Sequence, residues 1–203
     1  MKCNTIIEDT EISENYIINQ IDKVKFVKSK CLSIDVKECE MDIFDKSGKY
    51  ITYTPIQRKY HNKFKLRAFE GVGKVAEHKL FVLNEEFRGN GIATDISKNE
   101  EIIYKRNFFN EVHIDAAWDG VNVWRRLGFL YVNESDKNKL LIAWRAYFMK
   151  IWQGKDKLDI IRKYKIIDDV PIKYLKPKNL DSMGDWLLNS QTLPIIKMYK
   201  RIA

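Results

Sequence analysis

Residues 77–93 read Glu-His-Lys-Leu-Phe-Val-Leu-Asn-Glu-Glu-Phe-Arg-Gly-Asn-Gly-Ile-Ala, and this stretch decides the fold. It begins with a short apolar run, Leu80–Leu83, which favours a β-strand. It ends with Arg88–Gly91, where two glycines and an asparagine tolerate positive φ angles and leave room beside the main chain. A helix that begins at Ile92 would direct its unpaired N–H groups and the positive end of its dipole at this turn. The stretch therefore predicts a strand, a glycine turn and a helix N-terminus that can bind an anion.

The positions of the glycines exclude two common phosphate-binding loops. A nucleotide P-loop needs Gly-Lys-Ser/Thr, whereas Gly91 is followed here by Ile-Ala-Thr. The dinucleotide fingerprint Gly-x-Gly-x-x-Gly needs a glycine where this chain has Thr94. What remains is the pattern Arg-x-x-Gly-x-Ala, formed by Arg88, Gly91 and Ala93.

A second motif lies further along the chain. Residues 124–129 read Trp-Arg-Arg-Leu-Gly-Phe, in which the glycine ends a predicted short helix and the phenylalanine begins a strand. Together the two motifs resemble the GNAT (N-acetyltransferase) superfamily. Its pyrophosphate loop is written Gln/Arg-x-x-Gly-x-Gly/Ala, and a later short helix ends in Tyr-x-x-Leu-Gly-Phe. Trp124 stands where that tyrosine is expected, and the resemblance covers about residues 65–132.

The resemblance implies a mixed α/β (α+β) fold, with a mostly antiparallel central sheet flanked by helices. We expect one domain over residues 1–203. Its core would span about 32–133 and would be completed by a final strand at about 194–200. A helical insertion at about 136–190 would precede that strand, where the family plan has only a hairpin.

Hydrophobic periodicity predicts the individual elements. Helices are expected at residues 10–27, 92 to about 108, 140–152, 158–164 and 181–188. Strands are expected at 32–44, 50–54, 66–69, 80–83, 112–117, 130–132 and 194–199, with turns at 45–49 and 70–74. Residues 60–65 are read either as a loop over the site or as a surface connection. The wide apolar face of the 140–152 helix is expected to be core packed against the sheet, the alternative being a partner or membrane surface.

The composition is that of a globular protein with a basic surface. The 203 residues carry 36 Lys and Arg against 28 Asp and Glu, a formal net charge of +8, which attracts polyanions such as nucleic acid or coenzyme A. Three cysteines without Cys-x-x-Cys spacing and three scattered histidines predict neither a disulfide framework nor a metal site. The sequence has no signal peptide or run of bilayer length, and we expect a cytoplasmic location.

Acetyl-CoA is the cofactor that the resemblance implies. The backbones of Phe81, Val82 and Leu83 would bind the pantetheine arm, and a main-chain N–H near Leu83 would polarise the thioester carbonyl. The diphosphate would be held by the turn and helix start, that is by Arg88, Gly89, Asn90, Gly91, Ile92 and Ala93. Trp124, in the place of the family tyrosine, is the remaining expected cofactor contact.

Glu77 is the best candidate for the base that deprotonates the amine. It lies six residues before Leu83. Strand alternation predicts that both side chains share one face, and an apolar setting would raise the pKa of the carboxyl group. The alternative is a solvated glutamate at the entry of the strand. His78 would point to the opposite face, and His113 with Asp115 on the next strand is a further candidate pair.

Protonation of the departing thiolate is where the sequence departs from the family. An indole N–H such as that of Trp124 cannot give up its proton, so Tyr131 or water would have to serve as the acid. The asparagine that the family has seven residues before its tyrosine is replaced by Ala117, with Asp119 and Asn122 as imperfect substitutes.

Two functions follow from these observations. The first is an acyl-CoA-dependent N-acyltransferase that moves acetyl to an amine of an acceptor, either a small molecule or a protein. The alternative is a catalytically weak or inactive GNAT-fold binding or structural protein. No recognised motif or aromatic platform supports a nucleic-acid partner, and no membrane partner is expected. The oligomeric state is not predicted.

Overall fold

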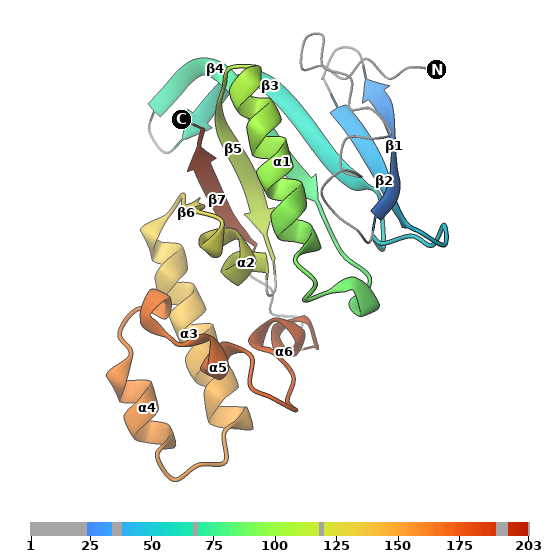
Figure 1. Cartoon of the computed structure of the whole chain (residues 1–203). Coiled ribbons are helices and arrows are strands. Elements are labelled where there is room, and N and C mark those ends of the chain that lie inside the picture. The colour runs from blue at the N-terminus through green and yellow to red at the C-terminus, as the bar shows by residue number, and fades with distance from the viewer. Residues whose placement is uncertain (1–23, 34–37, 67–68, 118–119, 190–194, 203) are drawn as a thin grey trace. The chain divides into compact units, whose positions relative to one another are not determined.

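The computed structural model describes residues 24–33, 38–66, 69–117, 120–189 and 195–202 (Figure 1). The chain forms two compact units, which are described separately below. The first comprises Met1–Ile114 and Tyr199–Ala203, and the second comprises Asp115–Met198. The expectation of a single domain with a helical insertion stays a prediction.

The first unit is built on a sheet with the strand order β1-β2-β3-β4-β5-β7. The strands from β1 to β4 pair antiparallel, and β4 pairs parallel with β5 because helix α1 crosses between them. The sequence-based expectation of a mixed α/β fold with a mostly antiparallel sheet is therefore confirmed. The strands are β1 (Val24–Ser33), β2 (Glu38–Asp45), β3 (Ile56–Leu66), β4 (Phe69–Leu80), β5 (Phe109–Ala116) and β7 (Ile196–Arg201).

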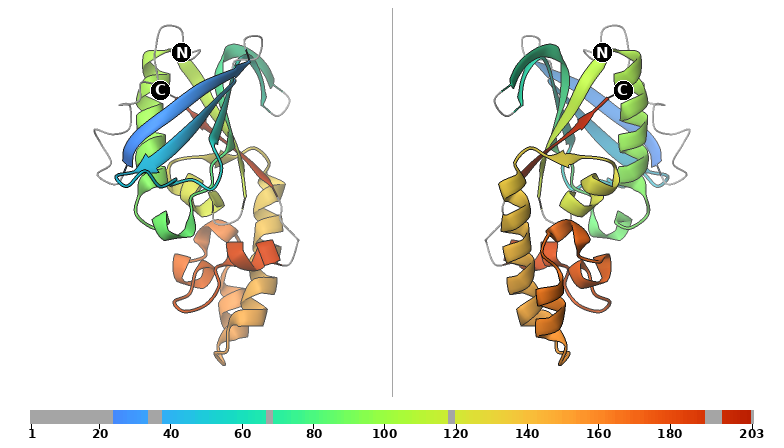
Figure 2. Two further views of the ribbon diagram at one scale, coloured as in Figure 1. Left: turned by 90° about the vertical axis from the view of Figure 1, so that its right-hand side faces the viewer. Right: turned by 90° about the vertical axis from the view of Figure 1, so that its left-hand side faces the viewer.

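Helix α1 (Ile92–Arg106) lies along one face of these strands, as Figure 2 shows. It follows the short 3₁₀ helix η1 (Glu85–Phe87) and begins at the predicted residue. Ile92 and Ile96 pack into a buried cluster with Met41, Ile43, Ile51 and Ile56. The predicted helix after the glycine turn is confirmed, and the start of α1 packs against this apolar cluster.

Two predictions for the first unit are wrong, one of a strand and one of a loop. Residues 50–54 form only isolated bridges, and the strand begins after Pro55 as β3, which also contains residues 60–65, interpreted from sequence as a loop. In β3, Ile56, Arg58 and Tyr60 point inward and alternate with more exposed polar residues. Because Arg58 is charged but occupies an inward-facing position, the alternation of apolar and polar residues typical of a strand cannot be recognised here from hydrophobicity.

The central strand was predicted too late in the sequence. It is β4, and residues 81–84 beyond it contain only a single bridge at Leu83. The turn predicted at 70–74 lies inside β4, where an irregularity in the pairing with β3 falls between Val72 and Val75. Glycine at a bulge gives the same sequence signal as glycine in a turn.

The N-terminal predictions are tested only in part. Of the helix expected at 10–27, residues 10–23 lie outside the described residues, and Val24–Val27 belong to strand β1 instead. The strand expected at 32–44 corresponds to the end of β1 and to β2.

The second unit is mainly helical and follows the predicted order. Its elements are α2 (Gly120–Arg126), β6 (Leu130–Tyr131), α3 (Glu134–Ile151), α4 (Lys157–Lys163), η2 (Ile167–Asp169), α5 (Ile172–Leu175) and α6 (Met183–Asn189). The Val132 N–H donates to the Lys197 carbonyl, so β6 lies beside the start of β7. On α3, Trp144, Tyr147 and Phe148 are completely buried, so the expected burial of this face is confirmed, but it packs mainly on helical elements of the second unit, with Tyr147 against Trp186 and Phe148 against Tyr174, and not on the sheet as expected. No helix among the described residues is long and apolar enough to span a bilayer.

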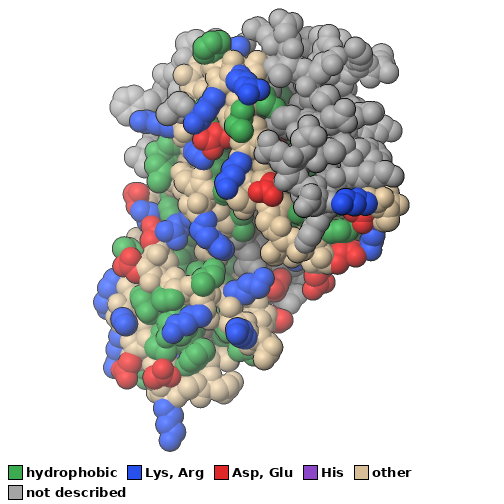
Figure 3. Space-filling model, viewed as in Figure 1, with side chains coloured by type: hydrophobic (Ala, Val, Ile, Leu, Met, Phe, Trp, Pro, Cys, Tyr) green, Lys and Arg blue, Asp and Glu red, His purple; other side chains and the backbone are tan. Residues whose placement is uncertain are grey.

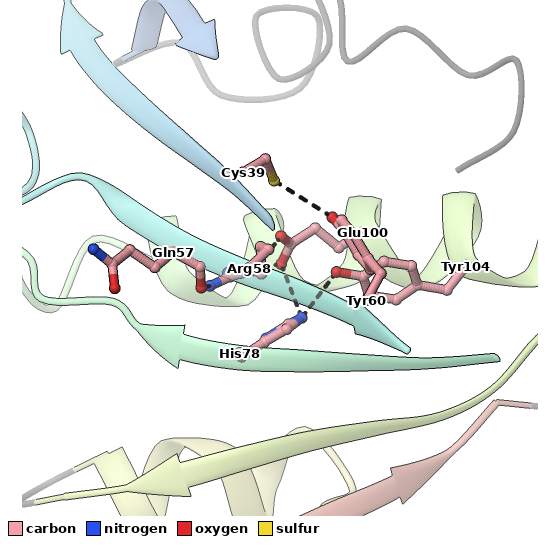
Figure 4. A network of polar contacts seen from close by, with 7 residues as sticks. All are labelled: Cys39, Gln57, Arg58, Tyr60, His78, Glu100 and Tyr104. Carbon is pink, nitrogen blue, oxygen red and sulfur yellow. Dashed lines mark hydrogen bonds and ion pairs between the residues drawn. The ribbon is translucent and has the colours of Figure 1, made fainter. Parts of the chain in front are cut away.

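A buried polar network joins α1 to strands β3 and β4 (Figure 4). Arg58 donates from Nε and Nη2 to the two carboxylate oxygens of Glu100, at 2.7 and 3.1 Å, and both side chains are buried. His78 Nε2 lies 2.9 Å from the Tyr104 hydroxyl and 3.8 Å from Glu100 Oε2. Burial, together with the charge of Arg58, holds the pKa of His78 well below its usual value, so the imidazole is neutral.

Loss of one partner of the Arg58–Glu100 pair is expected to be costly. Glu100→Gln leaves a buried guanidinium without its carboxylate and should lower the free energy of unfolding by about 3–5 kcal/mol. The double variant Arg58→Met/Glu100→Leu should lose less than this single variant, because no charge is left buried. Urea unfolding measures both.

The matched control is Glu86→Gln, which breaks the exposed Lys49–Glu86 pair of 2.7 Å and should leave the urea midpoint unchanged. Equal losses in Glu100→Gln and Glu86→Gln would contradict the assigned importance of the buried pair.

Candidate functional site

The start of α1, directly after the glycine turn, presents main-chain donors. Gly89 and Gly91 have φ angles of 76° and 80°, and Gly91 is the N-cap of α1 without any side-chain cap. The first helical bond runs from the Asp95 N–H to the Gly91 carbonyl. Within the described part of the chain, the N–H groups of residues 92–94 have no acceptor. These donors and the helix dipole favour an anion at this position.

The space in front of these donors is open. A Cβ atom built on Gly89 or Gly91 would meet no other atom within 4 Å. The Arg88 side chain turns back and donates from Nε to the Leu83 carbonyl at 3.0 Å, and Asn90 Nδ2 donates to the Arg88 carbonyl at 3.2 Å. The turn is therefore supported by side chains without being filled by them.

The chain leading into the turn leaves the parallel strand pairing early. The register between β4 and β5 ends at His78 and Ile114. Further along, the Val82 carbonyl accepts from the Tyr53 N–H at 2.9 Å, on the opposite edge. Because carbonyl and N–H directions alternate along an extended chain, the groups of Leu83 face away from that edge. Its carbonyl is used by Arg88, and its N–H has no partner among the described residues.

Three of the predicted cofactor residues come together in the core. The side chains of Phe81 and Leu83 pack against the buried cluster that contains Ile92. Their side chains are thus committed to packing, which leaves the backbone as the part of these residues available to a ligand.

An extra residue in β4 changes the face on which Glu77 lies. Gln57 pairs with Leu80 but Arg58 pairs with His78, so Lys79 is additional. His78 and Phe81 both contact groups on the α1 side, because the Arg58 guanidinium also lies 5.9 Å from the Phe81 ring. The prediction that Glu77 shares a face with Leu83 is therefore wrong, because a bulge breaks simple alternation. His78 lies opposite Glu77, as predicted, but on the same side as Leu83, which was not predicted.

Glu77 is held by a histidine and a lysine. Its Oε2 lies 3.0 Å from His61 Nε2, and its Oε1 accepts from Lys79 Nζ. Partial burial alone would raise the pKa of Glu77, but the hydrogen bonds and charges of Lys79 and His61 lower it below its ordinary value. The expected raised pKa is wrong: Glu77 is ionised at neutral pH and is a weak base.

A second histidine–carboxylate pair lies beside Glu77. His113 is its register neighbour on β5, and His113 Nε2 lies 2.8 Å from Glu111 Oε2. Sequence reasoning chose Asp115 as the partner and missed Glu111, which is buried. Simple alternation places Glu111, His113 and Asp115 on one face of β5, so Glu111 could have been found from the sequence as readily as Asp115. Across the described ranges, no group of three such ligands could hold a metal ion.

The remaining two predicted residues belong to the second unit. Trp124 is buried and packs edge-on against Phe129, with ring centroids 5.5 Å apart. Tyr131 is also buried, and its hydroxyl donates to Asp168 Oδ1 at 3.4 Å. Burial raises the pKa of Tyr131 well above its usual value, Arg125 lowers it and Asp168 raises it further. Such a phenol gives up its proton reluctantly.

Comparisons with known proteins identify only distant structural similarity. No protein-family model matches the sequence, and the search among curated proteins gave no match. A bacterial toxin structure has 16% identity and a TM-score of 0.35. The match covers 49% of this chain and 60% of that protein. Nourseothricin acetyltransferase has 10% identity and a TM-score of 0.41, with 86% of this chain and 71% of that one covered. Arylalkylamine N-acetyltransferase 2 from Aedes aegypti has 15% identity and a TM-score of 0.39, with 81% and 73% covered. At these scores the similarities assign neither a family nor a function to the chain.

The lowered pKa of Glu77 predicts a pH-dependent contribution to stability. The ionised carboxylate stabilises the folded state fully above its ordinary pKa of 4.5, and this contribution is lost as pH falls through the lowered value. Glu77→Gln should therefore unfold at lower urea concentration than the parent protein at neutral pH. The difference should shrink below about pH 4. A difference that is constant with pH would contradict the charge-based origin.

Proposed function

We propose that this protein is an acyl-CoA-dependent N-acyltransferase, with acetyl-CoA as donor and an amine of a small molecule or protein as acceptor. The observation that carries the proposal is the pair of features at residues 81–94. An open glycine turn and a helix start whose N–H groups at residues 92–94 have no acceptor among the described residues lie directly beyond a strand end whose Leu83 N–H is turned away from its paired edge. An extended ligand with a diphosphate at one end and a polarisable carbonyl at the other fits both.

The main-chain donors of residues 89–94 would bind the diphosphate of coenzyme A. Helix N-termini bind such groups because several N–H donors and the dipole act together. Arg88 would add charge through the guanidinium nitrogens that do not contact Leu83. The residues present thus fit the cofactor that the motif resemblance implies.

Bound acetyl-CoA supplies an activated acyl group, and the chain supplies polarisation and proton transfer. The Leu83 N–H would donate to the thioester oxygen, where negative charge develops. Glu77 would accept the proton of the amine through water, with His61 and Lys79 keeping it ionised. Its lowered pKa makes it a modest base, which favours a slow enzyme.

The second candidate function is a coenzyme-binding or structural protein without efficient turnover. The observation that favours it is in the second unit, where Trp124 fills core and the Tyr131 hydroxyl is bound to Asp168. Neither is prepared to protonate a thiolate. Turnover then depends on water as the acid.

A substitution in the turn should separate coenzyme binding from backbone strain. Gly89→Glu places a carboxylate in the open space of the turn and should weaken binding of acetyl-CoA and CoA at least about tenfold, equal to about 1.4 kcal/mol. Titration calorimetry measures the dissociation constants.

Gly48→Glu is the matched control. Gly48 has a φ of 87° and the same open surroundings, so both variants carry similar strain, but it lies in the β2 hairpin loop. This control should bind CoA like the parent protein. If the parent protein binds neither acetyl-CoA nor CoA, the proposal is wrong.

The role of Glu77 is tested by turnover. Glu77→Gln should lower kcat for thiol release with a panel of amines by roughly 100-fold and leave the dissociation constant of acetyl-CoA unchanged. Glu101→Gln is the control, because Glu101 is similarly half-buried, is paired with Lys200 and has a lowered pKa, yet lies on α1. Coenzyme binding without thiol release for any amine would favour the second candidate function.

A further inference from the structure

The net charge of the protein is concentrated in one segment. Residues 137–178 contain 12 Lys and Arg and 4 Asp and Glu, whereas the other 161 residues contain 24 of each. The whole formal charge of +8 therefore comes from residues 137–178, which begin after the acidic first turn of α3 and end beyond α5. We call this segment the basic segment.

Most cations of the basic segment are not neutralised. Eight of them are exposed and make no ion pair with a carboxylate in the described part of the protein: Lys150, Lys155, Arg162, Lys163, Lys165, Lys173, Lys176 and Lys178. In the first unit, by contrast, five lysines each pair with a carboxylate: Lys49, Lys59, Lys79, Lys105 and Lys200. The unpaired cations give the basic segment a positive potential that favours an anionic partner.

Large aliphatic side chains are exposed among these cations. Leu158, Ile166 and Ile172 are 52%, 44% and 51% exposed, and α3 exposes Ile142 and Met149. Figure 3 shows hydrophobic and basic side chains interspersed over the helices of the second unit. Such a mixture is a surface for a partner that brings both carboxylates and apolar groups.

The aromatic residues of the basic segment offer no stacking platform. Lys163 Nζ lies 5.7 Å from the centroid of the Tyr164 ring, and Lys173 Nζ lies 4.9 Å from that of Tyr174. Trp152 packs edge-to-face on Tyr174, with centroids 5.6 Å apart. Nucleic acids bind through phosphate contacts and base stacking on free ring faces, which would leave the exposed aliphatic side chains unused.

We propose that the basic segment is a docking surface for an acidic, amphipathic polypeptide segment of a protein partner. Carboxylates of the partner pair with the unneutralised lysines, and its apolar side chains cover Leu158, Ile166 and Ile172. The charge sets the rate and sign of recognition, and the apolar contacts supply most of the affinity. This proposal is independent of the acyltransferase proposal.

The test uses the full chain and a fluorescent synthetic peptide with Glu and Leu at helical spacing. Fluorescence anisotropy should show saturable binding that weakens with salt, and a peptide with Ser in place of Leu should bind about tenfold more weakly. The triple variant Arg162→Gln/Lys163→Gln/Lys165→Gln and the variant Leu158→Gln/Ile172→Gln should each weaken binding by about tenfold or more.

The matched controls alter equivalent residues of the first unit. Lys46→Gln/Lys98→Gln removes two exposed lysines, and Ile102→Gln replaces an isoleucine of α1 that is 44% exposed. Both should bind the peptide like the parent protein. Absence of binding, equal affinity for the Ser peptide, or tighter binding of duplex RNA or phosphatidylserine vesicles would each overturn the proposal.

Discussion

The ion pair between Arg58 and Glu100 is the constraint on which the first unit depends. Two charges removed from water are tolerated only in close contact, so strand β3 and helix α1 must meet at this point. Glu100 is four residues beyond Ile96, and Tyr104 is four beyond Glu100, so one face of α1 changes from apolar to polar along its length. The apolar half lies next to the glycine turn. The polar half therefore fixes the position of α1, and the side chains of the apolar half pack against the core.

Fixing α1 in this way leaves main-chain groups exposed at its start. The helix begins directly after Gly91, so no side chain caps it, and its first donors find no acceptor within the described chain. The bulge at Lys79 has a related effect, because it ends regular pairing of β4 and turns Leu83 away from the paired edge. Bulges and uncapped helix starts cost stability. Their occurrence within one short stretch is the physical reason to look for a ligand there.

The sequence predicted those elements whose ends are set by local chemistry. The glycine before Ile92 gave the start of α1, and the Leu-Gly-Phe motif gave the end of α2 at Arg126. Sequence-based prediction failed where contacts between residues far apart in the sequence determine the position of a side chain. Arg58 occupies a core position only because Glu100 lies across from it, and this relation is invisible in β3 alone. The face of Glu77 depends on a bulge, and its lowered pKa depends on Lys79 and also on His61, which is distant in sequence. The turn could be predicted, but the surroundings of the base could not.

The distribution of charge along the chain distinguishes the glycine turn from the basic segment, which the net charge alone does not. A net charge of +8 suits coenzyme A as well as any other polyanion, yet the residues outside the basic segment are balanced in charge. The glycine turn itself has Arg88 beside Glu85, Glu86 and Asp95, so its attraction for phosphate comes from main-chain donors and not from excess lysine. The basic segment therefore needs an explanation of its own, and an acidic partner with apolar side chains accounts for both its unpaired cations and its exposed aliphatic residues.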